Sequence, residues 1–438
     1  MWGSNFEKFN VSVNLVFLFF TATFFQGIFC ESQNHGGSSA INSFDLSAVF
    51  RVQGNVYPDG YFYTTLNIGT PPRPYHLDID TGSDLTWVNC DAPCVNCPKS
   101  PHKPYKPQGN NALPCKHSLC AVLQHSSSNY PCHNPSDQCD YEVEYADHGS
   151  SIGVLVRDNF PLQYLNGSTS HTPLVFGCGY DQDLSSSTEP PFVDGVLGLA
   201  NGKSSILSQL NDLKVTKNVF GHCLSDQGGG YLFLGDTLIP SGTVWVPMLK
   251  KQVGNYYSIG PAELLLDGKN VFKGGLSFVL DSGSTYTYLS SKVYEAALST
   301  IKKNINQKEL KMAPEDKTLP ICWKGVKPFK SINDVKKFFK HLALRFSKPS
   351  NAMLDMSPEA YLIVNKLGNV CLGILNGAEA GLDNLNVLGD ISLLNKMMIY
   401  NNDKSQIGWT TVNCDRLPNL DRDSDIDFYR SEYGYDEL

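Results

Sequence analysis

A short motif that occurs twice constrains the fold more than any other feature of this sequence. The tetrapeptide Asp80–Ser83 (Asp-Thr-Gly-Ser) returns as Asp281–Ser284 (Asp-Ser-Gly-Ser), and each copy ends an apolar, β-branched run. About 110 residues after each copy comes an apolar–apolar–Gly element, at 196–198 and at 387–389. Because two motifs recur in the same order, we expect two related lobes, with a boundary near residues 238–250.

Short strands dominate the rest of the pattern. β-branched and aromatic runs bounded by Gly and Pro predict strands at 61–68, 76–80, 85–88, 276–281 and 285–289. Apolar residues at helical spacing occur at 293–305 and at 335–342. The sequence therefore predicts an all-β fold, mainly β with a few short helices.

The charge of the chain argues against one class of function. The chain has 438 residues and a formal net charge of −8, so it has no basic surplus for binding nucleic acid. Residues 415–438 hold eight Asp/Glu and three Arg, and they lack aliphatic periodicity. We expect this acidic tail to be disordered and the rest of the chain to be nearly neutral.

The N-terminus has the pattern of a targeting segment. Lys8 precedes an apolar stretch from Val11 to Phe29, and the polar run 31–34 follows. This order is typical of a cleaved signal peptide at 1–30, with a retained membrane anchor as the alternative. We expect entry into the secretory pathway, delivery to the extracellular space, cell wall or vacuole, and no membrane anchor after cleavage.

The cysteines are consistent with an oxidising compartment. There are thirteen, and removal of Cys30 with the signal peptide leaves twelve. Cys94-x-x-Cys97, with His102 and His117 nearby, offers zinc as an alternative, but disulfides are the better interpretation in a secreted chain. We therefore predict no metal site, and disulfides among Cys90, Cys94, Cys97, Cys115, Cys120, Cys132, Cys139, Cys178, Cys223, Cys322, Cys371 and Cys414.

The chemistry of paired carboxyls explains the residue types of the repeated motif. Two carboxyls about 3 Å apart cannot both ionise readily, so they share one proton over a wide acidic range. The ionised member can act as general base on a water between them, while the protonated member polarises a scissile carbonyl without any cofactor. Asp80 and Asp281 are the predicted catalytic residues. The supporting loop residues are Thr81, Gly82, Ser83, Ser282, Gly283 and Ser284.

With these motifs the chain resembles the pepsin-like aspartic endopeptidases. More narrowly it is similar to the plant nucellin-like subgroup, with a Cys-rich insertion like that of the nepenthesins. The resemblance covers about residues 55–414 and implies a bilobal pepsin-like fold with the active site between the lobes. It implies an active-site indole at Trp87 and a substrate-binding flap tyrosine at Tyr145, where His148 stands in place of the usual Gly. It also implies a disulfide between Cys322 and Cys371.

These observations divide the chain into segments. We expect a signal peptide at 1–30, a short N-terminal or pro segment at 31–54, an N-terminal lobe at 55–240 with a Cys-rich insertion at 90–139, a C-terminal lobe at 241–414 and the tail at 415–438. The saposin-like insert of typical plant aspartic proteases is missing, and 31–54 is short for an inhibitory propeptide.

Two functions remain open at this point. The first is a monomeric aspartic-type endopeptidase that cleaves an extended peptide or protein substrate at acidic pH, with apolar side chains flanking the cut as the resemblance implies. The alternative is a catalytically weak or inactive scaffold that serves as a secreted inhibitor or binding protein. The two intact motifs favour the protease.

Asn166 begins an Asn-Gly-Ser glycosylation sequon and is a predicted surface site.

Overall fold

The computed structural model describes the fold in ten segments of the chain. These are residues 46–93, 99–124, 134–146, 148–183, 192–250, 255–272, 274–306, 308–350, 352–382 and 384–416. The predicted signal peptide, most of the acidic tail, and Cys94, Cys97 and Cys132 lie outside them. Within these ten segments, no helix combines the length and apolar character that crossing a membrane requires.

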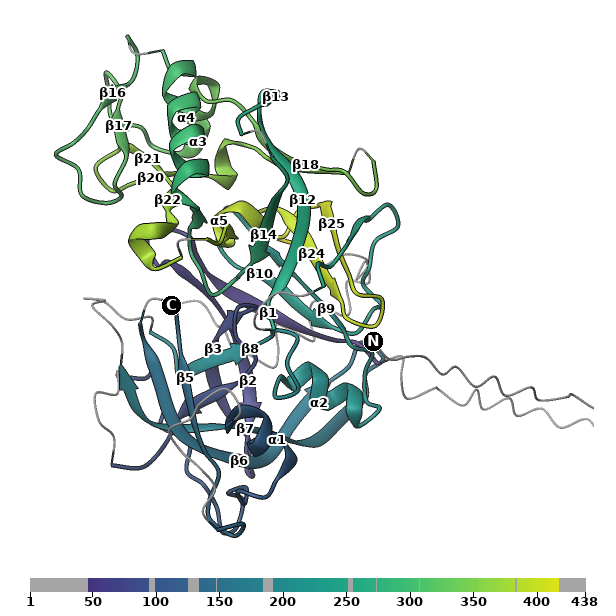
Figure 1. The fold of residues 1–438 in the computed structure, drawn as a ribbon. Helices are drawn as coiled ribbons and strands as arrows, with labels where there is room; N and C mark the ends of the chain where they lie inside the picture. The colour runs from purple at the N-terminus through teal and green to yellow at the C-terminus, as the bar shows by residue number, and fades with distance from the viewer. Residues whose placement is uncertain are drawn as a thin grey trace, which may run out of the picture. The chain divides into compact units, whose positions relative to one another are not determined.

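The described residues form three β-sheets, with 13, 8 and 4 strands (Figure 1). The 13-stranded sheet has the order β11-β25-β24-β9-β10-β1-β2-β3-β8-β4-β7-β6-β5. Its strands are β1 (Ala48–Asn55), β2 (Tyr61–Ile68), β3 (Arg73–Asp80), β4 (Trp87–Asn89), β5 (Asp140–Glu144), β6 (Ser150–Gln163), β7 (Thr169–Asp183), β8 (Gly195–Gly198), β9 (Val219–Leu224), β10 (Gly230–Leu234), β11 (Val244–Pro247), β24 (Lys396–Asn401) and β25 (Gln406–Thr411).

The other two sheets lie within the second half of the chain. The 8-stranded sheet contains β12 (Tyr257–Leu266), β14 (Leu276–Leu280), β15 (Thr287–Leu289), β18 (Leu342–Phe346), β19 (Met353–Met356), β22 (Ile374–Asn376) and β23 (Val387–Leu388), with β13 (Lys269–Asn270) beside β12. The 4-stranded sheet contains β16 (Lys311–Met312), β17 (Cys322–Lys324), β20 (Leu362–Val364) and β21 (Val370–Leu372). The predicted mainly-β fold is confirmed.

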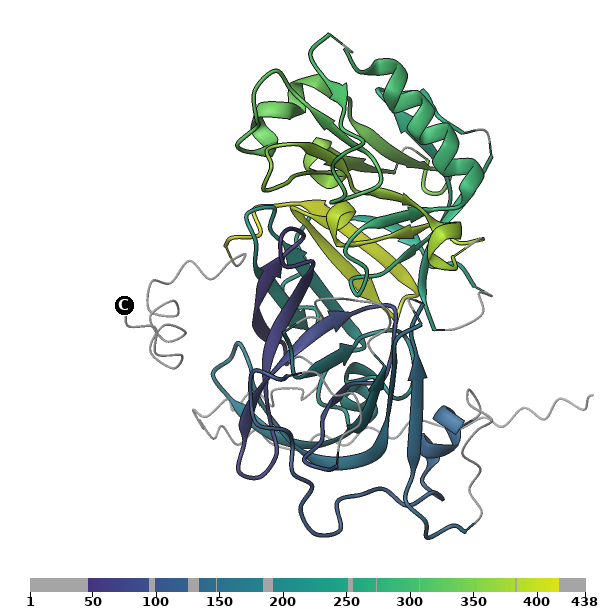
Figure 2. The same ribbon diagram turned by 90° about the vertical axis from the view of Figure 1, so that its left-hand side faces the viewer.

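The two lobes share the 13-stranded sheet. We call residues up to 240 the N-terminal lobe and those that follow the C-terminal lobe. β9 of the N-terminal lobe pairs with β24, β24 pairs with β25, and β25 pairs with β11. In Figures 1 and 2 the yellow strands β24 and β25 lie against the teal strands of the N-terminal lobe. Backbone hydrogen bonds therefore run without a break from one lobe into the other.

The alternation of β2 shows how the sequence dictates this sheet. Every second residue of β2 is buried, namely Phe62, Thr64, Leu66 and Ile68. The intervening side chains are partly exposed, since successive side chains of a strand point to opposite faces. A turn at 69–72 then leads into β3, which pairs antiparallel with β2. The strand predicted at 61–68 is confirmed at both ends.

The two apolar–apolar–Gly elements occupy equivalent places in the two lobes. β8 pairs in parallel with β3, so that Gly198 lies opposite Asp80. β23 pairs in parallel with β14, so that Leu388 lies opposite Leu280. Each element thus supports the strand that leads to one motif aspartate, which is the arrangement that two related lobes predict.

The helices are α1 (Ser118–Gln124), α2 (Ile206–Asp212), α3 (Ser291–Asn304), α4 (Ile332–Val335) and α5 (Asp390–Leu393), with 3₁₀ turns η2 (Lys336–Phe338), η3 (Pro358–Ala360) and η4 (Gly377–Ala380). α3 confirms the helix predicted at 293–305. The helix predicted at 335–342 is confirmed only in its first half, where α4 ends and η2 follows, because Leu342 begins β18. β18 pairs with β12 and β19, and this tertiary pairing overrides the local spacing.

The structure describes residues 46–54 of the expected N-terminal segment 31–54, and these residues are part of the N-terminal lobe. β1 lies between β10 and β2 in the shared sheet, with Ala48 and Val52 buried. The boundary predicted at residue 55 therefore falls inside a strand. A strand with only two or three inward apolar residues gives too weak a pattern to be recognised from sequence.

Four disulfides join described cysteines. They are Cys90–Cys178, Cys120–Cys139, Cys223–Cys414 and Cys322–Cys371, and Cys115 is also disulfide-bonded. The Cys322–Cys371 pair is the one that the resemblance implied, and it joins opposite residues of β17 and β21. Cys90–Cys178 and Cys120–Cys139 fasten the Cys-rich insertion, whose described residues contain the short helix α1 and otherwise little regular structure.

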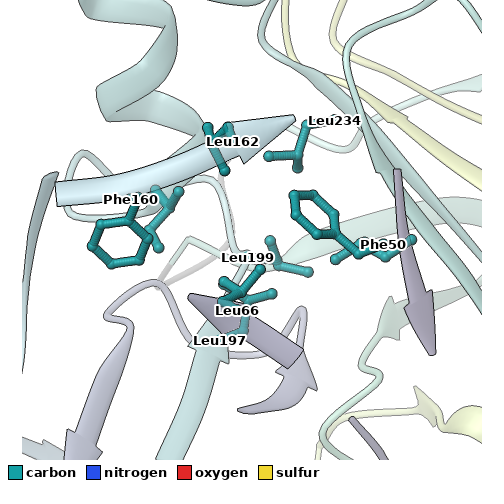
Figure 3. Close-up of a pocket in the computed structure, with 9 residues that line it drawn as sticks. Phe50, Leu66, Phe160, Leu162, Leu197, Leu199 and Leu234 are labelled. Atoms are coloured by element: carbon teal, nitrogen blue, oxygen red, sulfur yellow. The ribbon is translucent and has the colours of Figure 1, made fainter. Parts of the chain in front are cut away.

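A small cavity lies in the core of the N-terminal lobe (Figure 3). Its lining consists of apolar side chains from β1, β2, β6, β8, β10, α2 and the residue after β8, among them Phe50, Leu197 and Leu234. Because a cavity of this kind offers no polar group to orient a ligand, we interpret it as a feature of core packing.

Because His222 is buried, we predict that the protein becomes less stable as the pH falls. The histidine lies on β9 with Nε2 3.0 Å from the Tyr400 hydroxyl, and burial lowers the pKa of His222 to about 3. The unfolded chain binds this proton near pH 6.5, so the free energy of unfolding falls as pH drops below about 6.5, by about 3 kcal/mol at pH 4. His222→Gln keeps a polar group without the charge. We expect a smaller loss of stability between pH 6.5 and 4 in denaturant titrations; equal losses would contradict this.

Candidate active site

The two motif loops are joined by hydrogen bonds that repeat one another. Thr81 N donates to Ser282 Oγ (3.1 Å), and Ser282 N donates to Thr81 Oγ1 (2.9 Å). The Thr81 hydroxyl donates to Leu280 O (3.0 Å), and the Ser282 hydroxyl donates to Ile79 O (2.7 Å). Both side chains are buried. These bonds hold the ends of β3 and β14 together although 201 positions separate the two loops.

The glycine of each loop permits the opposite carboxyl to approach. A Cβ atom on Gly82 would lie 2.5 Å from Asp281 Oδ1, and one on Gly283 would lie 2.5 Å from Asp80 Oδ1. No side chain fits at such a distance. The motif therefore needs glycine because each loop backbone passes directly beside the other aspartate.

Each carboxyl also receives two hydrogen bonds from its own loop. Gly82 N donates to Asp80 Oδ1 (2.7 Å), and Ser83 Oγ donates to Asp80 Oδ2. In the other loop Gly283 N donates to Asp281 Oδ1 (3.0 Å), and Ser284 Oγ donates to Asp281 Oδ2 (2.8 Å). The two carboxyls also lie beside each other, close enough to interact directly. Asp281 is partly exposed, so solvent reaches the pair.

Burial and mutual repulsion determine the protonation of this pair. Burial, and then the charge of Asp281, raise the pKa of Asp80. Burial also raises the pKa of Asp281, although hydrogen bonds from Ser284 and Gly283 oppose this rise. The two ionisations belong to the coupled pair rather than to either residue. The pair therefore keeps one proton to a higher pH than an isolated carboxyl does.

Two further carboxyls near the pair were missed by the sequence analysis. Asp78 lies two residues before Asp80 on β3, and Asp390 begins α5 after Gly389. Burial, followed by the charges of neighbouring carboxyls, raises the pKa of both well above the ordinary value. The period of two in β3 could have identified Asp78. Comparison of the two repeats could have identified Asp390, which stands where the first repeat has Leu199.

A buried tyrosine from the C-terminal lobe supports the loops from behind. Tyr400 on β24 lies near the Thr81 side chain, and its ring stacks on Phe220 with centroids 4.5 Å apart. No local sequence signal connects Tyr400 with the motif, because the contact depends on the pairing of β24 with β9.

The structure brings Trp87 and Tyr145 together. Tyr145 lies at the turn between β5 and β6, and Trp87 Nε1 donates to its hydroxyl at 2.6 Å. The charge of Asp80, after burial, raises the pKa of Tyr145, so the hairpin turn lies close to the aspartate pair. In the same turn His148 adopts φ 68°, which explains why glycine is usual at this place.

One cluster of possible metal ligands lies at the other end of β3. Asp194 accepts hydrogen bonds from His76 N (2.7 Å), His102 N (3.0 Å) and His102 Nδ1 (2.7 Å). Because these bonds already satisfy the carboxylate, we interpret the network as the attachment of the Cys-rich insertion to β3 and β8. In the second such cluster Cys322 and Cys371 form a disulfide, so they are not free to bind a metal.

Asn166 lies in an exposed turn between β6 and β7. Its Oδ1 accepts hydrogen bonds from Ser168 N (2.9 Å) and Ser168 Oγ (2.7 Å). The side chain is accessible to a modifying enzyme, and its glycosylation stays a prediction.

The fold and the paired loops define the class of a pepsin-like aspartic proteinase, and the comparisons with known proteins agree. Two family models, described as Xylanase inhibitor N-terminal and Xylanase inhibitor C-terminal, match residues 62–236 and 259–411. An aspartic proteinase of rice (Oryza sativa subsp. japonica) is 44% identical over 383 residues, which cover 85% of this chain and 92% of the rice protein. The chain belongs to the pepsin-like aspartic proteinase family of plants.

More distant relatives share most of the chain. Aspartic proteinase 39 of Arabidopsis thaliana is 28% identical, covering 81% of this chain and 75% of its own. Aspartic proteinase nepenthesin-1 of Nepenthes gracilis is 26% identical, covering 83% and 80%. The crystal structure of Basic 7S globulin from soybean has a TM-score of 0.67 at 17% identity, over 86% of this chain and 100% of the globulin. At this identity, the similarity to the globulin shows only that the two proteins share a fold.

Removal of the Thr81 hydroxyl tests the reciprocal hydrogen bonds. In Thr81→Val, Ser282 N and Leu280 O lose their buried partner, and each such group costs about 1–3 kcal/mol. We expect the free energy of unfolding to fall by about 2 kcal/mol or more in denaturant titrations. Thr81→Ser keeps the hydroxyl and is the control. If the Val and Ser variants are equally stable, the hydroxyl does not join the loops.

Proposed function

We propose that the protein is an aspartic-type endopeptidase that hydrolyses peptide bonds in proteins at acidic pH. The observation that carries the proposal is the pair Asp80 and Asp281, held beside each other by two loops that are joined by hydrogen bonds. Such a pair retains one proton when both pKa values are raised, so an acid and a base are present together at acidic pH.

The mechanism follows from this shared proton. The ionised carboxyl removes a proton from a water molecule that both carboxyls hold, and the water oxygen attacks the scissile carbonyl carbon. The protonated carboxyl gives its proton to the carbonyl oxygen, which yields a tetrahedral diol without a covalent enzyme intermediate. The C–N bond then breaks as the amine nitrogen takes a proton and one diol hydroxyl returns a proton to the pair. The pair ends with one proton, as it began.

The residues around the pair suit these roles. Ser83 and Ser284 donate to the outer carboxyl oxygens, and Gly82 and Gly283 donate to the inner ones, so neither carboxyl can rotate freely. Tyr145, fixed by Trp87, would close over an extended peptide substrate. The expected monomeric state and the absence of a cofactor requirement are part of this proposal.

A secreted inhibitor or binding protein is the second candidate. The observation that favours it is the description of both matching family models as xylanase inhibitor segments. Inhibition requires no shared proton, whereas this chain keeps both aspartates and every loop donor in place. The protease is therefore the better supported of the two.

Asparagine substitution of the pair separates the candidates. In Asp80→Asn or Asp281→Asn the acid–base couple is lost, and we expect kcat/KM on denatured globin at pH 3–5 to fall at least about 10²-fold. A statine-type transition-state mimic should block the parent protein. Because a raised carboxyl pKa lowers stability as pH rises, both variants should be at least as stable as the parent at pH 7.

The matched control is Glu295→Gln, which removes an exposed carboxyl on α3 and should leave activity unchanged. Activity of the parent should fall at higher pH as the pair loses its last proton. Asparagine variants that digest globin like the parent would exclude the pair as the catalyst. A pure parent protein that cleaves nothing at any pH would favour the inhibitor.

We also propose that the protein is made in the secretory pathway and carries a glycan on Asn166. The four described disulfides support an oxidising compartment, and the exposed turn supports the modification. Protein secreted by plant cells should begin after residue 30 and lose mass with a glycosidase, whereas Asn166→Gln should not. A retained N-terminus, or equal mass of parent and variant, would contradict the corresponding part.

A further inference from the structure

Asp78 is a carboxyl beside the catalytic pair that the proposed mechanism does not use. Because successive side chains of a strand alternate, Asp78 and Asp80 lie on the same face of β3, about 7 Å apart along the strand. Asp78 is partly exposed, and its charge interacts with both Asp80 and Asp281. Asp78 is therefore displaced along β3 from Asp80, so a substrate bound at the pair would present to Asp78 a residue next to the scissile bond.

The carboxyl of Asp78 is poorly satisfied by the protein. Oδ1 is buried and has no hydrogen-bond partner among the described residues, and only the Ile79 backbone is close enough to lower the raised pKa of this carboxyl noticeably. None of the ion pairs between described residues includes Asp78. The histidine on the same strand face, His76, is turned to Thr65 Oγ1 (3.0 Å) and to the His102 ring. Because its pKa is raised, this carboxyl is largely protonated when nothing is bound beside it. A cation placed at the unpartnered Oδ1 would favour the ionised form and supply the missing partner.

Tyrosines from the neighbouring strand and from the β5–β6 turn lie near this carboxyl. Tyr63 is its direct cross-strand neighbour on β2, and the rings of Tyr61 and Tyr63 have centroids 6.0 Å apart. Both tyrosines are partly exposed, and the charges of Asp59 and Asp78, after burial, contribute to the raised pKa of Tyr61. Tyr145 also lies within electrostatic range of Asp78. A carboxylate beside tyrosine rings matches a long basic side chain, whose stem packs on the rings while its charge meets the carboxylate.

We propose that Asp78, with Tyr61 and Tyr63, forms a subsite that selects a lysine or arginine next to the scissile bond. This inference rests on the proposed endopeptidase function and names part of its substrate class. It differs from the apolar preference that the family resemblance implies. Asp78 is a specificity residue, since it contacts substrate without taking part in proton transfer.

The test compares two peptides that differ at one residue flanking the cut, Lys in one and its uncharged isostere norleucine in the other. For the parent protein we expect kcat/KM to be at least about tenfold higher for the Lys peptide, which corresponds to one close charge pair. In Asp78→Asn, which keeps shape and polarity, the Lys advantage should disappear while cleavage of the norleucine peptide stays within about threefold of the parent. The loss should lie mainly in KM.

Two controls keep the outcome interpretable. Glu295→Gln removes an exposed carboxyl on α3 and should leave the Lys advantage unchanged. Asp78→Glu should restore part of it, which a merely structural role would not do. A parent protein that cleaves both peptides equally, or an Asp78→Asn variant that retains the Lys advantage, would overturn the subsite. Failure of the parent to cleave any peptide would instead overturn the proposed function.

Discussion

The hydrogen bonds between Thr81 and Ser282 are the constraint on which the rest of the site depends. Each loop supplies one hydroxyl and one N–H to the other, so neither loop is satisfied unless both are in place. The same approach forces glycine into both loops and brings two carboxyls into contact. Repulsion between them, and their burial, make folding of the loops unfavourable for ionised aspartates. The interlocked bonds are what oppose that repulsion.

Much of this arrangement follows from the repeated motif. The strand at 61–68, the helix α3 and the equivalent positions of β8 and β23 were predictable, because a turn, an amphipathic stripe and a recurring apolar–apolar–Gly element are local patterns. Asp80 and Asp281 stand out for the same reason. Two copies of a short motif, each ending an apolar strand, leave few ways to bury both strands without joining the loops.

What the sequence did not predict depends on contacts between distant segments. Tyr400 reaches Thr81 because β24 pairs with β9, and no local pattern around Tyr400 reports that pairing. The helix predicted around Leu342 fails because β12 and β19 take that residue into a sheet. Asp78 was missed for another reason. The period of two in β3 places it on the face of Asp80, yet a carboxyl inside a strand usually faces solvent, and the burial of its Oδ1 depends on the tertiary structure.

The strand order of the shared sheet has a consequence for biosynthesis. β24 and β25 follow all the other strands along the chain, yet they lie beside β9 in the sheet that also contains β3. A ribosome-bound chain that still lacks residues 396–411 therefore has both aspartates but not the scaffold that aligns them. The alignment of the two aspartates therefore depends on strands that follow both of them along the chain.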